Sequence, residues 1–318
     1  MTIAHSAFST KIRRYDAESL REAALLIRAG EPVAAPTETV YGLAADATDS
    51  NAVAAIYSAK GRPSFNPLIV HVADHAMAEK LAHFCPQAER LAERFWPGAL
   101  TLVLPVRQDS GLSPLVMAGL PTVAIRLPAH PAMRALIRES GRPLAAPSAN
   151  RSGAISPTRA EHVLASLNGK IRMILDAGPT SEGVESTIAA PQADCIRLLR
   201  PGPVTAAMLE EAGGLPVMTG KTGAKIEAPG QQESHYAPSK PVRLEVMNAE
   251  KEEFLIGFGL MPCNVNLSPD ADLREAAANL FAALHLADAS AASAIAVAPV
   301  PNEGIGVAIN DRLRRAAA

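Results

Sequence analysis

Apolar residues follow two different spacings along the first two thirds of the chain. In the segment 16–30 they recur every three or four residues, and Asp16 can cap and Gly30 can end the helix that this pattern predicts. The segment 68–72 is instead a short continuous run rich in β-branched residues, which is typical of a buried strand. The same patterns predict further helices over 49–60, 88–95, 132–139, 158–167 and 204–211, and further strands over 33–35, 100–104, 122–127, 144–146, 172–175, 186–189 and 196–199. We therefore expect an α/β domain of roughly 210 residues.

The residues from 213 to 241 differ in composition. They are rich in Gly, Pro, Thr, Lys and Gln and show no apolar period, so we expect a linker or a functional lid rather than part of a compact domain. Beyond them, the pattern predicts strands over 242–246, 254–258 and 294–298 and a helix over 273–286. The predicted organisation is an N-terminal domain (1–212), a linker or lid (213–241) and a smaller α/β domain (242–318).

The composition limits the classes of function. A length of 318 residues fits about two domains. The formal net charge is −2, which is not the basic balance expected of a nucleic-acid-binding protein. Aromatic residues make up only 4% of the chain, so surface platforms for base stacking are not expected. A local basic pocket stays compatible with this balance, because a few cations in a cleft focus their field on phosphates.

The cysteines and the N-terminal segment bear on the cellular compartment in which we expect the protein. Cys85, Cys195 and Cys263 are far apart and form no Cys-x-x-Cys pair, so we expect free thiols rather than a zinc ribbon or a redox pair. No signal peptide or membrane-spanning helix can be drawn, so we expect a cytoplasmic protein with no membrane contact.

Two apparent motifs are weak. The segment 214–222 resembles a phosphate-binding P-loop, but five residues separate its glycines where the motif requires four, so we favour the linker interpretation. His71 and His75 stand four apart, but His71 ends a predicted strand and Asp74 can cap a helix between them, so a zinc site is disfavoured. We expect no metal ligands from protein side chains.

Four segments share a stronger character, in which an extended run is followed by polar residues with Gly or Pro. They are 35–43 (APTETVYGL), 60–68 (KGRPSFNPL), 145–153 (AAPSANRSG) and 183–187 (GVEST). Ligands of open α/β sheets bind at the ends of strands, so these segments predict one polar site.

The basic residues of these segments allow two interpretations. Lys60 and Arg62 close a helix, where they could simply compensate its dipole, or they could bind a triphosphate, with Ser148 and Asn150 adding neutral donors. Arg126 ends a predicted strand, where it could clamp a carboxylate or form a surface ion pair.

These segments together resemble the YrdC-like, threonylcarbamoyl-AMP synthase family. The resemblance rests on Lys60-Gly61-Arg62, Ser148-Ala149-Asn150, Pro36 to Leu43, Phe95-Trp96-Pro97-Gly98 and Arg200-Pro201-Gly202. The segments Ser234-His235-Tyr236-Ala237-Pro238 and Asn310-Asp311-Arg312-Leu313 are similar to the long form of the family. The resemblance implies a twisted mixed sheet in the first domain and a smaller Rossmann-like second domain.

The resemblance also implies a reaction. L-threonine, bicarbonate and ATP would give threonylcarbamoyl-AMP and pyrophosphate, and a separate transferase complex would use the product to modify tRNA, with at most weak tRNA contact by this chain. By motif position, the threonine would be surrounded by Thr39, His71, Arg126, Ala146 and Ser186. ATP would contact Arg62, Asn66, Thr122, Ser148, Ser156, Arg200 and Tyr236, with Lys60 and Asn150 completing the phosphate site. His235 and Tyr236 would lie in the lid.

Phosphoryl transfer requires in-line positioning and stabilisation of the departing charge. We expect Lys60, Arg62 and Arg200 to stabilise the departing negative charge, with Mg²⁺ bridging phosphate oxygens. The sequence offers no obvious general base. One alternative is an RNA-binding or ribosome-maturation factor that uses the same basic cavity, against which the charge and the aromatic content argue. A second is a carbamoyl-transferring enzyme of hydrogenase maturation, which would need Cys-rich zinc motifs. A third is a docking role for the second domain.

Overall fold

The computed structural model describes residues 9–63, 66–219 and 235–318. Ser64 and Phe65 of the segment 60–68, Ser234, and the greater part of the predicted lid, 220–233, lie outside the described residues. Among the described residues, no helix combines the length and the apolar character that crossing a bilayer needs.

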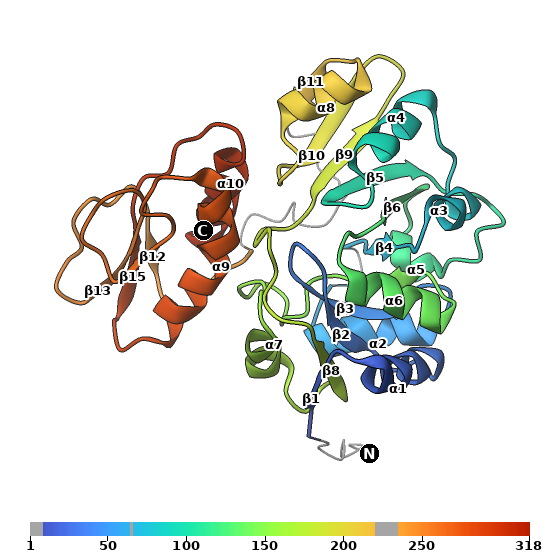
Figure 1. Ribbon diagram of the computed structural model, residues 1–318, viewed down its shortest axis with the longest axis horizontal. Coiled ribbons are helices and arrows are strands. Elements are labelled where there is room, and N and C mark those ends of the chain that lie inside the picture. The colour runs from blue at the N-terminus through green and yellow to red at the C-terminus, as the bar shows by residue number, and fades with distance from the viewer. Residues whose placement is uncertain (1–8, 64–65, 220–234) are drawn as a thin grey trace.

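The first domain is built on a mixed sheet of eleven strands in the order β1-β8-β2-β3-β7-β4-β6-β5-β9-β10-β11 (Figure 1). The strands are β1 (Lys11–Arg14), β2 (Val33–Pro36), β3 (Tyr41–Asp46), β4 (Ile69–His71), β5 (Leu100–Pro105), β6 (Thr122–Arg126), β7 (Leu144–Ala145), β8 (Met173–Asp176), β9 (Thr187–Pro191), β10 (Ile196–Arg200) and β11 (Val217–Thr219). Neighbours such as β4 and β6 are parallel, whereas β5 and β6 are antiparallel. The predicted mixed α/β sheet is confirmed.

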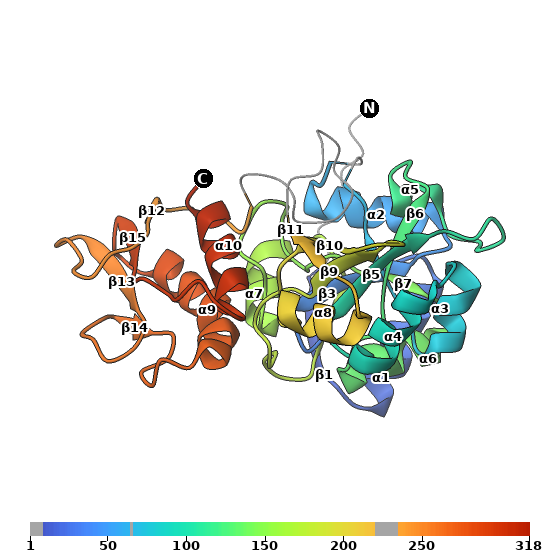
Figure 2. The same ribbon diagram turned by 90° about the horizontal axis from the view of Figure 1, so that it is seen from above.

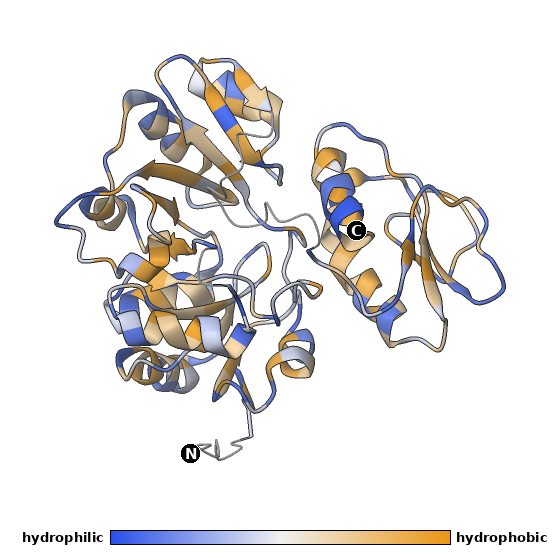
Figure 3. Cartoon of the chain, turned by 180° about the vertical axis from the view of Figure 1, so that it is seen from behind, coloured by the Kyte–Doolittle hydropathy of each residue, from blue (hydrophilic) through white to orange (hydrophobic). Residues whose placement is uncertain are grey.

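Helices cover both faces of this sheet. They are α1 (Ala17–Arg28), α2 (Ser50–Lys60), α3 (His75–Leu81), α4 (Pro86–Phe95), α5 (Pro114–Met117), α6 (Pro131–Ser140), α7 (Ala160–Leu167) and α8 (Ala206–Gly213). Successive residues of β2 alternate between two cores, because Val33 and Ala35 pack in one apolar cluster and Ala34 in the other. Figure 3 shows the sheet strands as mostly hydrophobic, with hydrophilic residues on loops and outer helix faces.

The second domain is a parallel four-stranded sheet in the order β12-β15-β13-β14. Its elements are β12 (Val242–Arg243), β13 (Glu253–Gly257), β14 (Val265–Asn266), α9 (Leu273–Ala289), β15 (Ala294–Val297) and α10 (Gly306–Ala316). Helices α9 and α10 lie between this sheet and the first domain, with α7 beside α9 (Figures 1 and 2).

One apolar cluster contains residues of both domains. Val40, Ile155 and Val184 of the first domain pack in the same cluster as Phe281 of α9, together with Tyr236. Gly183, at φ +69°, makes this contact possible, because a Cβ there would stand 2.3 Å from the Ala277 carbonyl oxygen. The second domain is therefore packed onto a loop of the first.

Some elements differ from the sequence prediction. Strand β3 falls where only a polar segment was expected, because Gly42, Ala44 and Ala45 give it little strand propensity. Strand β11 lies inside the region predicted to lack structure and pairs with β10. The sequence prediction has no helix at α10, which begins without a side-chain cap.

Candidate active site

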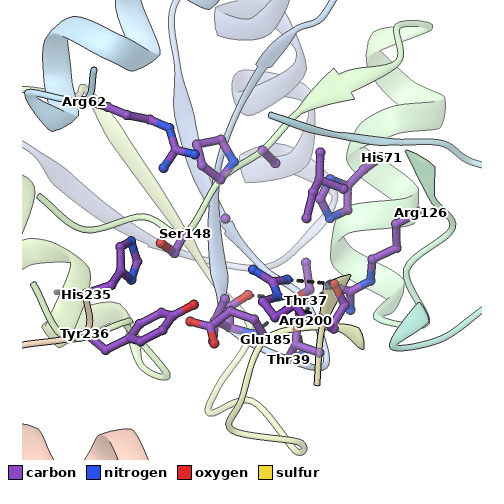
Figure 4. Close-up of a pocket in the computed structure, with 16 residues that line it drawn as sticks. Thr37, Thr39, Arg62, His71, Arg126, Ser148, Glu185, Arg200, His235 and Tyr236 are labelled. Atoms are coloured by element: carbon purple, nitrogen blue, oxygen red, sulfur yellow. Dashed lines mark hydrogen bonds between the residues drawn. The ribbon is translucent and has the colours of Figure 1, made fainter. Parts of the chain in front are cut away.

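A pocket lies where several strands and loops of the first domain meet the segment that carries His235 and Tyr236 (Figure 4). Ten of the residues predicted from the sequence line it: Thr39, Arg62, His71, Arg126, Ala146, Ser148, Ser186, Arg200, His235 and Tyr236. Thr37, Val40, Gly42, Ile69, Pro147 and Glu185 complete the described lining. Residues from eight stretches of the sequence thus converge on one cavity. Five predicted residues do not line it: Lys60, Asn66, Thr122, Asn150 and Ser156.

Local structure explains the placement of Arg62. Helix α2 begins at an Asp49 cap and ends at Gly61, whose left-handed conformation (φ +59°) turns the chain. Arg62 follows this turn, and its guanidinium donates to the carbonyl oxygens of Asn66 (3.4 Å) and Pro67 (3.1 Å). Burial is the main effect that lowers the pKa of Arg62, to about 10, so the side chain stays charged at neutral pH.

Lys60 supports the pocket from behind. Its ammonium donates to the carbonyl oxygens of Ser148 and Asn150, both at 2.5 Å, and the residue is almost completely buried. Burial first, and then the charge of Arg62, hold the pKa of Lys60 well below its usual range. Lys60 therefore fixes the loop that carries Ser148, and an anion near the pocket would favour its charged form.

Three further residues of the predicted ATP site lie around this loop or beside Arg62. Asn150 donates from Nδ2 to the carbonyl oxygens of Arg151 (3.0 Å) and Ala154 (2.7 Å). Ser156 donates from Oγ to Glu185. Both side-chain atoms of Asn66 are buried without a hydrogen-bond partner among the described residues. Asn66 is thus a polar group with unused capacity next to the pocket.

Thr122 lies at the opposite end of β6 from Arg126. Alternate residues of a strand face the same side, so Thr122 faces the pocket side of the sheet about 13 Å from Arg126. Between them, Ala124 belongs to an apolar cluster with Ile69, Val103 and Ile188. This side of the sheet therefore has an arginine at one end, a hydroxyl at the other and apolar side chains between.

Arg126 is held by a fixed set of partners. It donates to Glu38 Oε1 (Nη2, 2.6 Å), Thr39 Oγ1 (Nη1, 2.9 Å) and the Gly98 carbonyl oxygen (Nε, 3.1 Å). The ion pair with Glu38 is buried, so the interpretation of Arg126 as half of a surface ion pair is wrong. A guanidinium has five N–H groups, and two of them remain for a ligand carboxylate.

His71 lies opposite Arg126 in the register of β4 and β6. Burial is the main effect that lowers its pKa, to about 3, with a further contribution from the Arg126 charge, so its imidazole is neutral. Its Nδ1 has no hydrogen-bond partner in the part of the chain that the structure describes. The pocket therefore offers a neutral ring nitrogen beside a cation.

Arg200 and Ser186 form a second fixed pair in the wall. Arg200 donates to the carbonyl oxygen (3.0 Å) and to Oγ (3.1 Å) of Ser186. Ser186 Oγ also lies 2.7 Å from Thr101 Oγ1. Burial, above all, lowers the pKa of Arg200. Three buried arginines around one cavity are costly when it is empty, which indicates an anionic ligand.

Sequence reasoning missed Glu38 and Glu185 as members of the site, although both lie inside the quoted segments. Glu185 lines the pocket and accepts from Ser156 and from Arg312 of α10 (2.9 Å). Burial raises its pKa, but the charges of Arg312 and Arg200 and the hydrogen bonds outweigh that effect, so the net pKa is lowered and Glu185 is ionised. Its partner stands 127 residues away, a distance that no sequence pattern reports.

His235 and Tyr236 close one side of the pocket. The His235 amide donates to the Arg315 carbonyl oxygen (3.1 Å), and the Ala237 amide donates to that of Gly153 (2.8 Å). Tyr236 has φ +64°, a strained conformation for this residue type, and its ring lies 5.6 Å from that of Phe281. The pair is therefore held between the two domains.

The geometry defines a class of protein. A cavity lined by three buried arginines, hydroxyls and a neutral histidine is typical of an enzyme that binds a small, multiply charged substrate. The Sua5–YciO–YrdC family model, described as telomere recombination, matches residues 25–202, and the model described as threonylcarbamoyl-AMP synthase, C-terminal domain, matches residues 204–318. The chain belongs to this family, in its two-domain form.

Relatives match over nearly the whole chain. Threonylcarbamoyl-AMP synthase of Bacillus subtilis (strain 168) is 45% identical, covering 94% of this chain and 92% of the relative. The protein of the same name from Pyrococcus abyssi is 42% identical and covers 95% of each. The crystal structure of P. abyssi Sua5 complexed with L-threonine matches with a TM-score of 0.88 and 40% identity, over 97% of this chain and 98% of that chain.

Proposed function

We propose that this chain is an L-threonylcarbamoyladenylate synthase, which converts L-threonine, bicarbonate and ATP into threonylcarbamoyl-AMP and pyrophosphate. The observation that carries the proposal is the single cavity bounded by Arg62, Arg126 and Arg200, all buried. The two relatives named above are called threonylcarbamoyl-AMP synthase, and the chain covers more than nine tenths of each.

The threonine subsite is proposed around Arg126. The two N–H groups that Glu38, Thr39 and Gly98 leave unused would bind the threonine carboxylate. Thr39, His71, Ala146 and Ser186 line the same cavity and would surround the rest of the amino acid. Support comes from the similar P. abyssi protein, whose crystal structure is of a complex with L-threonine.

The nucleotide subsite is proposed on the side of Arg62 and Arg200. These guanidiniums and Ser148 would bind the triphosphate, while Lys60 and Asn150 would keep the Ser148 loop in place. The base and ribose would lie over the apolar residues of the sheet and reach toward Thr122. Asn66, Ser156 and Tyr236 would border this subsite.

The chemistry needs two steps. The threonine ammonium group first loses one proton to solvent, and the free amine adds to the bicarbonate carbon with loss of water. The resulting carbamate oxygen then attacks the α-phosphorus as pyrophosphate leaves. Arg62 and Arg200 would stabilise the departing charge, and the buried cavity would keep water from the mixed anhydride. Bicarbonate would bind between the two subsites.

Mg²⁺ fits this site only as a companion of the triphosphate. No group of three or more His, Cys, Asp or Glu side chains within residues 9–63, 66–219 and 235–318 could hold a metal ion. Both oxygens of Glu185 are already used by Ser156 and Arg312. Phosphate oxygens and water would therefore ligate the ion, which would add charge stabilisation when bound.

The product would be passed to a separate tRNA threonylcarbamoyl transferase complex, since an acyl-adenylate is an activated donor. The three cysteines are free thiols, which supports a reducing, cytoplasmic location. An RNA-binding role for the cavity is not favoured, because buried arginines cannot reach a macromolecular backbone.

Amino-acid-dependent release of pyrophosphate tests the proposal. Protein, Mg·ATP and bicarbonate are incubated with threonine, with serine or with neither, and pyrophosphate is measured. We expect release that requires both bicarbonate and threonine. Release that ignores the amino acid, or none under any combination, would remove the proposed activity.

A further inference from the structure

The guanidinium of Arg312 reaches the active site from the second domain. Its side chain is completely buried and donates to Glu185 Oε2 (2.9 Å), to the Pro201 carbonyl oxygen (2.8 Å) and, weakly, to the Glu185 carbonyl oxygen (3.4 Å). The same guanidinium donates to Asp311 Oδ2 (3.0 Å), which keeps a second cation, Arg315, as a partner. It also lies 5.5 Å from the centre of the Tyr236 ring. Two pocket-lining residues, Glu185 and Tyr236, thus contact one side chain of α10.

The Glu185 carboxylate is out of place in a polyanion site. It is the one acidic side chain among the described residues that line the pocket, and it lies between Tyr236 and Arg200 in Figure 4. An unpaired carboxylate there would repel a triphosphate, and it would compete with that triphosphate for Arg200. The ion pair with Arg312, which does not line the cavity, neutralises the Glu185 carboxylate and so removes both effects.

Stability alone does not explain this pair. A buried ion pair often gives no more stability than apolar side chains of the same volume. Here the pair joins the two domains at the wall of the pocket, and the same helix also accepts the His235 amide through the Arg315 carbonyl oxygen. The packing of α10 against the first domain therefore determines whether the Glu185 carboxylate in the pocket wall is paired with a cation.

We propose that Arg312 is a positioning residue for the nucleotide subsite: from the second domain it neutralises and orients Glu185, so that Arg62 and Arg200 remain available to the ATP phosphates. The inference rests on the proposed function, since it takes ATP as the anion. The Asn310-Asp311-Arg312-Leu313 motif would then contribute to ATP binding, although it lies outside the domain that forms most of the pocket.

The test is a rescue experiment on the full-length chain, with the ATP dissociation constant measured by calorimetry. Arg312→Met strands the Glu185 carboxylate and is expected to weaken ATP binding about 10- to 100-fold, below the cost of losing a direct contact. Glu185→Gln combined with Arg312→Met removes the stranded charge and should restore ATP affinity to within about tenfold of wild type. Arg314→Met, an exposed arginine of the same helix, is the matched control and should leave ATP affinity unchanged.

A merely structural role predicts a different result. If Arg312 only held the domains together, the double variant would bind ATP as poorly as Arg312→Met, or worse, and that outcome would overturn the proposal. Unchanged ATP affinity in folded Arg312→Met would overturn it equally. If Arg312→Met does not fold, the ATP affinity of the double variant tests the proposal. An affinity more than about 100-fold below that of wild type would show that removing the Glu185 charge does not restore ATP binding, and would contradict the proposal.

Pyrophosphate release by the same proteins separates the two proposals. The ATP affinities decide the role of Arg312 whether or not the wild-type chain turns over. Failure of the wild-type chain to release pyrophosphate would count against the proposed function alone.

Discussion

Arg126 illustrates how single residues are prepared for a ligand. Its three contacts to Glu38, Thr39 and Gly98 fix the plane of the guanidinium and leave two N–H groups for a carboxylate. A rigid fork loses little conformational entropy when it binds, which a mobile surface arginine cannot match.

Arg126→Ala should raise the KM for threonine about 10²- to 10³-fold, while the KM for ATP changes much less. The substitution also leaves Glu38 charged and unpaired in the interior, at a cost of about 3–5 kcal/mol in stability. Kinetics are therefore measured well below the Tm, with Arg126→Lys, which keeps a cation beside Glu38, as the folding control. An unchanged threonine KM in both variants would reject the carboxylate clamp.

Lys60 is a second residue whose role depends on burial. Lys60→Met should lower the Tm, because the carbonyl oxygens of Ser148 and Asn150 lose their donor, and should also reduce ATP turnover. The effect on the Tm follows from the structure, because the burial of Lys60 is not visible in the sequence. Lys170→Met, at an exposed lysine, is the matched control in thermal melts and turnover assays. A Lys60→Met protein with wild-type Tm and turnover would refute the supporting role.

Several residues that the sequence analysis proposes for the site line the pocket, because they belong to short polar segments that are visible in the sequence. Arg62 lies between a glycine and a proline after helix α2, and Ser148 and Arg200 lie next to prolines that follow strands. Polar residues in such turns favour a site. Partners such as Arg312 for Glu185 could not be predicted, because the contact joins two domains and depends on how they pack.

At the scale of elements, α7 and α9 meet through two stacked histidines. The rings of His162 and His285 are 3.8 Å apart, and His285 Nε2 contacts the Ser156 carbonyl oxygen (3.1 Å). Burial is the main effect that lowers the pKa of His162, to about 3, with smaller effects of His285 and Arg159. Burial also lowers the pKa of His285, so both rings are neutral at this interface near pH 7.

This interface should weaken on acidification. An unfolded histidine takes up its proton near pH 6.5, whereas folded His162 does so only near pH 3. Between these values the unfolded chain binds more protons, so stability decreases as the pH falls below 6.5. His162→Phe keeps a stacked ring without the titration and should show a shallower loss of Tm between pH 7 and pH 5. Parallel curves for the two proteins would contradict this assignment.

Elements with strong apolar periods, such as α1 and α4, agree with the sequence prediction. Strand β3 and helix α10 do not, because small residues and a missing cap leave little local signal. Their positions are set by pairing with β2 and by packing against α9.

At the scale of the whole molecule, the second domain holds part of the pocket wall in place. Gly183 contacts α9, Arg312 pairs with Glu185, and His235 and Tyr236 are held between the domains. The predicted lid thus has two described residues in the pocket wall. The sequence predicted two domains but not that the pocket wall depends on contacts between them, because no local sequence pattern indicates which surfaces pack together.

A chain that ends after Thr219 should lose adenylate formation even where its sheet still folds. Removal of the second domain exposes Val40, Ile155 and Val184 and leaves Glu185 without Arg312. Circular dichroism and threonine-dependent pyrophosphate release report folding and activity separately. Full activity of this shorter chain would contradict a contribution of the second domain to the site.

The most direct measurement uses ¹³C-bicarbonate. Protein, Mg·ATP, threonine and labelled bicarbonate are mixed, and the nucleotide products are analysed by mass spectrometry. We expect an adenylate that contains both threonine and the labelled carbon, formed in amounts equal to the pyrophosphate. A threonyl adenylate without the label, or ATP hydrolysis with no threonine-containing nucleotide, would contradict it.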